Sequence, residues 1–195
     1  MSKTSLIALT LMFLVPAASV SAAGWQVDLD PERTTVSFTL KATMHTVHGT
    51  ANLATGSLVI DPDSGAVDGE IVIDAPSTET GNGSRDKKMH AKVLVSGEHP
   101  LIVLRPQQIQ GNLTAGPDST VTLVGDLELL GTPHPVTIPL DIRIDGSSFT
   151  ATAEFTVPYA AWGLKDPSTF VLRVAKEVRV QVATEGTIKI EDQDR

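Results

Sequence analysis

The chain has 195 residues, of which 41% are hydrophobic, 19% charged and 4% aromatic, enough for one domain with its own core. Its 15 Lys and Arg are outnumbered by 23 Asp and Glu, giving a formal net charge of -8, so nucleic acid is not expected as a partner. No cysteine occurs, which excludes disulfides, thiolate metal sites and a cysteine nucleophile.

Residues 1–23 have the pattern of a secretory signal peptide. Lys3 precedes an apolar run from Leu6 to Val15, and small residues follow up to Ala23. The run is about half the length that a membrane helix needs. We expect export and cleavage after Ala22 or, preferably, Ala23; an uncleaved interfacial anchor is the alternative. No second long apolar run occurs, so a chain that does not span the membrane is expected.

Apolar and polar residues alternate from residue 34 onward, as in strands with one buried face. The clearest runs are 36–42, 121–129, 136–144, 149–157 and 178–182, and less regular ones are 53–60, 67–75 and 101–104. Turn sequences separate these runs, and Asp145-Gly146 is a good hairpin signal. About eight short strands with few helices predict an all-β antiparallel sandwich or barrel.

One helix is predicted from Arg85 to about Val95. Ser84 is the expected cap, and Met89 and Val93 form an apolar stripe four residues apart. A single helix cannot cover the apolar faces of so many strands, so closure of the sheet into a barrel is the economical solution.

The apolar faces of the predicted strands carry side chains of modest size. Small residues such as Gly125, Ala151 and Ala153 reduce the filling of the interior, which favours a cavity for one small ligand. An outer-membrane barrel would alternate similarly, but five Phe, two Trp and one Tyr are too few for two aromatic girdles.

The sequence shows no catalytic constellation and no cofactor motif. His45 and His48 are three residues apart, so on a strand they point to opposite faces and no metal site is expected. The stretch from Asp61 to Asp68 resembles a calcium loop but has Ala66 where glycine is required. Motifs of zinc proteases, serine hydrolases and nucleotide-binding loops do not occur.

Two stretches resemble the YceI-like, polyisoprenoid-binding family. Thr80 to His90, with Glu98 to Ile102 after it, is similar to the family's T-G-N-x-x-R-D-x-h-M and h-P-x-I segments. Gly125 to Val136 is similar to its G-D-L-T-L-x-G-x-x-x-P-V segment, and Gly56 to Asp61 fits its Asp-Pro turn. The resemblance runs from about Trp25 to Ile190.

The resemblance implies a lipocalin-like antiparallel barrel of about eight strands with one short inserted helix, in the bacterial periplasm. Its long apolar cavity would hold an isoprenoid or similar lipid, without catalysis. The domain would span 24–190, between the signal peptide 1–23 and a polar tail 191–195. Many members have a Phe-Gly segment before the last strand, where this chain has the longer Val157–Ser168, so the role of 158–176 stays open.

The inward faces supply the candidate ligand-binding residues, with Tyr159 and Trp162 as expected rim residues. The full set is Val36, Phe38, Leu40, Leu123, Leu127, Ile138, Leu140, Phe149, Phe155, Tyr159 and Trp162. Ordinary core packing is the alternative for each of them. For the protein, the alternative is a non-catalytic envelope-stress or interaction protein that uses its barrel as a scaffold; an enzyme ranks third, and homodimerisation stays open.

Overall fold

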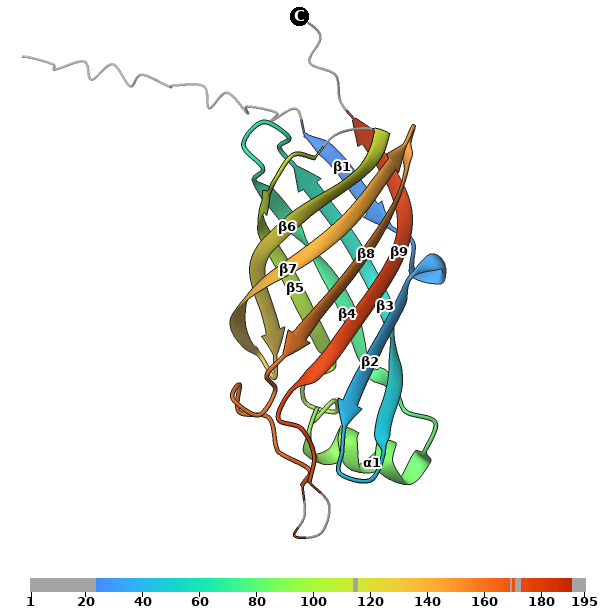
Figure 1. The fold of residues 1–195 in the computed structure, drawn as a ribbon, viewed down its shortest axis with the longest axis vertical. Helices are drawn as coiled ribbons and strands as arrows, with labels where there is room; N and C mark the ends of the chain where they lie inside the picture. Colours follow the sequence, from blue (N-terminus) through green and yellow to red (C-terminus); the bar gives the residue numbers. More distant parts are fainter. Residues whose placement is uncertain (1–23, 114–115, 169, 171–172, 191–195) are drawn as a thin grey trace, which may run out of the picture.

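Nine strands and one short α-helix form the described part of the chain, residues 24–113, 116–168, 170 and 173–190, in a computed structural model (Figure 1). The strands are β1 (Trp25–Leu29), β2 (Thr35–Lys41), β3 (Thr46–Ile60), β4 (Val67–Glu79), β5 (Leu101–Gln110), β6 (Gly116–Leu129), β7 (Thr132–Asp145), β8 (Ser148–Val157) and β9 (Val178–Ile190). The helix is α1 (Gly83–Lys92), and a 3-10 turn, η1 (Pro31–Arg33), joins β1 to β2. The predicted signal peptide and polar tail lie outside the described residues.

The nine strands close into a barrel with eight positions, because β1 and β2 share one of them. Both pair antiparallel with β3 on one side and β9 on the other. Val27 of β1 lies opposite Leu58 and Ile188, whereas Phe38 of β2 lies opposite Gly49 and Val180. β3 also pairs with β4, which completes the ring from β3 through β9. The predicted antiparallel barrel of about eight strands with one short helix is confirmed.

The alternation of the sequence is converted directly into an inner and an outer face. On β7, Val136, Ile138 and Ile144 are buried, while Thr137 and Pro139 between them point outward; β6 and β8 continue the rule. Strand β1 escaped the sequence analysis because it has five residues and only Val27 among them is buried.

Turns and close backbone contacts fix the register between strands. Leu130 and Gly131 both have positive φ, 52° and 72°, as a two-residue hairpin turn between β6 and β7 requires. A Cβ on Gly125 would lie 2.3 Å from the Arg105 carbonyl oxygen and 2.8 Å from the Cα of Pro106. Gly125 therefore lets β5 and β6 approach at the irregularity beside Pro106. It is not among the residues that line the interior cavity, although Leu123 and Leu127 on either side of it are.

Helix α1 lies across one end of the barrel, next to the turn between β2 and β3 (Figure 1). Its N-cap is Asn82, whose side-chain oxygen accepts a hydrogen bond from the Arg85 amide at 3.0 Å. The prediction of Ser84 as the cap was wrong by two residues, and the helix ends at Lys92, before the predicted Val95. No residue of α1 is buried. In the described residues no helix is long and apolar enough to span a membrane.

Two clusters of buried side chains pack the barrel. One joins Val27, Ile109, Val121, Ile144 and Phe149 at the end remote from α1. The other packs the loop after β8 against β6 and β7, and its buried members are Leu123, Leu127, Leu129, Val136, Ile138, Val157, Tyr159 and Leu164. Space remains between and beside these clusters.

Candidate functional site: an apolar cavity beside the helix

A cavity of about 890 Å³ occupies the interior of the barrel. This volume lies near the upper end of the range of small-molecule pockets, roughly 300–1,000 Å³. All nine strands contribute lining residues, and nearly all of those are aliphatic or aromatic. An eight-position barrel is wide enough to hold one slender ligand when its inward side chains are small, as Ala151 and Ala153 are here. The interior therefore offers a long, apolar compartment.

Ten of the candidate residues from the sequence line this cavity. They are Val36, Phe38, Leu40, Leu123, Leu127, Ile138, Leu140, Phe149, Phe155 and Tyr159. Trp162 does not line it. Its ring stacks on His134, with ring centroids 4.3 Å apart and planes 2° from parallel. Strand periodicity thus identified inward positions correctly, whereas the position of a loop residue such as Trp162 depends on a partner distant in sequence.

Sequence reasoning missed a second set of lining residues, on α1 and its C-cap Val93. Arg85, Lys88, Met89, Lys92 and Val93 all line the cavity, and their spacing of three and four residues places them on one helix face. The Met89–Val93 stripe was a usable signal for this face. The cationic members were missed because nothing local in the sequence says that the helix lies across the barrel.

Full charges in the described lining are confined to the α1 end. They belong to Arg85, Lys88 and Lys92 of the helix, and to Lys165 and Asp166 of the loop after β8. His45, in the turn between β2 and β3, also lines this end of the cavity. Asp166 pairs with Lys176 and accepts a hydrogen bond from the Ser168 amide at 2.9 Å. These contacts, the Lys176 hydrogen bond foremost, lower the pKa of Asp166 to about 2. This end of the cavity, which we call the rim, is therefore cationic, whereas the rest of the described lining carries no full charge.

A hydrogen-bond network fixes the start of α1 to the end of β4. Arg85 donates from Nε to the Thr80 hydroxyl at 2.6 Å and from a terminal nitrogen to the Thr80 carbonyl at 3.0 Å. Asp86 accepts from the Thr80 amide at 3.1 Å and from its hydroxyl. The hydroxyl bond is the main cause that lowers the pKa of Asp86, against the opposing effect of burial. Arg85 and Asp86 therefore form a positioning pair at the rim.

One polar group faces the cavity without a protein partner. Thr78 is 6% exposed and lines the cavity, and its hydroxyl oxygen has no hydrogen-bond partner among the described residues. A buried hydroxyl left unpaired costs about 1–3 kcal/mol, so a polar group of a bound molecule would be favoured here. Thr78 lies two residues before Thr80, close to the cationic rim.

The other polar clusters do not form a metal centre. Among the described residues, no three His, Asp or Glu side chains come close enough together to hold a metal ion. His48 donates to or accepts from the Thr39 hydroxyl at 3.1 Å on the outside of β2 and β3, while His45 turns to the cavity rim.

These features define a class of protein: a closed antiparallel barrel around a long apolar cavity with one charged end. The chain belongs to the YceI-like domain family, whose profile matches residues 25–186. No curated protein matches the chain.

Solved structures share this fold at low sequence identity. A polyisoprenoid-binding domain from Saccharophagus degradans implicated in plant cell wall breakdown is 18% identical, with a TM-score of 0.66 over 84% of this chain and 98% of its own. BcnA of Burkholderia cenocepacia is 20% identical, with a TM-score of 0.67 over 81% and 99%. The YCEI protein of Campylobacter jejuni is 10% identical, with a TM-score of 0.56 over 97% and 99%.

Proposed function

We propose that this protein is a non-catalytic periplasmic carrier that holds the tail of a polyisoprenoid or similar amphiphilic lipid inside its barrel. The observation that carries the proposal is the division of the cavity: about 890 Å³ of apolar interior with full charges only at the α1 end. The polyisoprenoid-binding domain of Saccharophagus degradans has the same fold and supports the choice of cargo. The periplasmic location rests on the sequence pattern of residues 1–23.

The energetics favour a long tail. Each buried CH₂ contributes about 0.8 kcal/mol, so about 20 carbons contribute about 16 kcal/mol. Association costs roughly 4–15 kcal/mol, and a tail of only a few carbons would not offset it. Strand β3 is 15 residues long, which at a usual tilt corresponds to about 38 Å along the barrel axis. The barrel is therefore long enough for an extended chain.

The polar end of the cargo belongs at the α1 end in this proposal. Lys88 and Lys92 line the rim, and the unpaired Thr78 hydroxyl faces the cavity. A headgroup there keeps its charge or hydrogen-bonding atoms near water and cations, whereas at the other end it would meet the cluster around Val27 and Phe149. The cargo would thus enter tail first.

Native mass spectrometry of protein purified from its own host tests the proposal. We expect an adduct in the mass range of a long-chain lipid that solvent extraction removes and added lipid restores. Protein that is repeatedly recovered empty, and that rejects long-tailed amphiphiles added afterwards, would overturn the carrier and favour a barrel that serves as a scaffold.

A further inference from the structure

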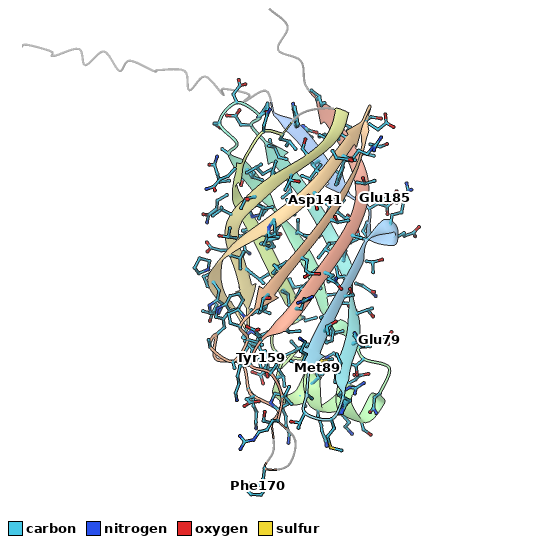
Figure 2. The ribbon with its side chains drawn as sticks, in the orientation of Figure 1. Glu79, Met89, Asp141, Tyr159, Phe170 and Glu185 are labelled. Carbon is cyan, nitrogen blue, oxygen red and sulfur yellow. The ribbon has the colours of Figure 1, made fainter. Side chains whose placement is uncertain are left out.

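The two most exposed large apolar side chains of the described residues lie at the cavity mouth. Phe170 is 96% exposed and Met44 is 80% exposed, while the next, Leu101, is 49% exposed. Figure 2 shows Phe170 at the tip of the loop after β8, beyond the end of the barrel where Tyr159 and Met89 lie. Met44 lies in the turn between β2 and β3, at the same end (Figure 1).

The two loops that carry these side chains are tied together. The Thr43 amide donates to the Arg173 carbonyl at 2.9 Å, and the Arg173 amide donates back to the Thr43 hydroxyl at 3.2 Å. Ala42 and Val174 form an antiparallel bridge beside them. The exposed apolar tips therefore belong to one connected platform at the mouth.

The same end is positively charged on an acidic protein. We define the mouth segments as 41–48, 80–99, 158–168 and 173–177. Their eight basic residues are Lys41, Arg85, Lys87, Lys88, Lys92, Lys165, Arg173 and Lys176. Their four acidic residues are Asp86, Glu98, Asp166 and Glu177. The rest of the chain has 7 Lys and Arg against 19 Asp and Glu. A negative surface would therefore attract the mouth and repel the remainder of the molecule.

We propose that the mouth segments and Phe170 dock onto an anionic lipid bilayer, with the cavity opening facing the membrane. The inference rests on the proposed function, because a lipid that moves from membrane to barrel would otherwise expose its tail to water. Basic residues near an anionic leaflet and an inserted apolar side chain are two signals that together give stable peripheral binding. A second copy of this chain is a poor occupant, since two positive ends would repel each other.

Exposed lysines of α1 supply part of the positive charge of the docking surface. Lys87, Lys88 and Lys92 are exposed, so they can approach lipid phosphates without unfolding the helix. Each Lys or Arg near an anionic surface strengthens binding by about fivefold. Burial of a phenylalanine ring strengthens it by about tenfold or more.

Sedimentation with lipid vesicles tests the docking surface on the whole exported chain, with no cargo lipid added. We expect binding to vesicles with about one third phosphatidylglycerol, weak binding to pure phosphatidylcholine, and loss of binding at high salt because exposed charges are screened. The double variant Lys87→Gln, Lys92→Gln should bind roughly 25-fold more weakly. The matched variant Arg143→Gln, Lys189→Gln removes two charges outside the mouth segments and should bind like the wild type.

The apolar part of the surface has its own control. Phe170→Ser should weaken vesicle binding by about tenfold or more, whereas Ile190→Ser, at the exposed end of β9, should not. In a Phe170→Trp variant, emission above the background of Trp25 and Trp162 should shift to the blue on anionic vesicles. Equal effects of mouth and remote substitutions, or equal binding to both lipids, would overturn the docking surface.

Docking and cargo binding can fail separately in these experiments. A protein that captures long-tailed lipid from micelles but ignores vesicles would refute docking and leave the carrier intact. A protein that binds anionic vesicles through its mouth but never retains lipid would refute the carrier and leave docking.

Discussion

A tryptophan at Ala153 should block the cavity half-way along β8. Ala153 lies opposite Leu140 on β7 and Val182 on β9, and all three line the cavity. An indole buries about 150–250 Å², and an interior of eight strands has little width to spare. The ring would therefore separate the part of the cavity beyond Ala153 from the mouth.

The length of the blocked part sets the size of the effect. From Ser148 to Ala153 the strand rises about 16 Å, or about 12 Å along the axis of a tilted barrel. An extended alkyl chain advances about 1.25 Å per carbon, so a long tail that loses this stretch loses the burial of about ten methylenes, or about 8 kcal/mol, which is roughly a millionfold weaker affinity. A short tail of about eight carbons should lose much less. Ala153→Leu should give an intermediate loss.

Displacement of a fluorescent long-chain probe measures this affinity, and thermal unfolding shows that each variant is folded. Thr156→Trp is the matched control, because Thr156 is on the same strand but is exposed on its outer face. It should bind like the wild type. If folded Ala153→Trp protein keeps the wild-type affinity for long tails, the tail does not occupy the interior of the barrel.

Three further predictions test the framework around the cavity. Gly125→Ala should lower the free energy of unfolding by about 1–3 kcal/mol in denaturant titrations, because the added methyl group would meet the β5 backbone. The control Gly97→Ala should be neutral, because the space around Gly97 is open. Equal effects of the two substitutions would contradict the close approach of β5 and β6 at Gly125. Tyr159→Phe loses a 2.8 Å hydrogen bond to a main-chain carbonyl and should lower the melting temperature by about 2–4 °C, and an unchanged value would show that the bond is not stabilising. Lys176 and Ser168 lower the pKa of Asp166 from 3.8 to about 2. The contacts of the Asp166 carboxylate should therefore be complete above about pH 4 and lost as the pH falls through about 2. An NMR titration midpoint at 3.8, or a midpoint that Lys176→Gln leaves unchanged, would refute the pairing of Asp166 with Lys176.

The sequence was sufficient for the barrel and for most inward residues, because both follow from local periodicity. Phe38, Ile138 and Phe155 were identified by alternation alone, and alternation is what puts a side chain on the inner face of a strand. The closure of the sheet into a barrel followed from the argument that one helix cannot cover the apolar faces of so many strands. The sharing of one barrel position by β1 and β2 was not accessible, because it depends on pairings with β3 and β9 far away in the sequence.

The charged rim could not be predicted for the same reason. In the sequence Lys88 and Lys92 look like ordinary exposed helix residues, and they line the cavity only because α1 lies across the end of the barrel. Trp162 was expected at the rim, but it does not line the cavity and its ring stacks on His134. Local patterns report whether a side chain is buried; they do not report which distant segment it meets.

A high-resolution crystal structure of the protein after incubation with a long-tailed isoprenoid amphiphile would show whether the barrel is a container. We expect continuous elongated density from the rim at Lys88 past Leu140 and Ala153, with its polar end near Thr78. An interior filled by the protein's own side chains, with the amphiphile outside or absent, would contradict it.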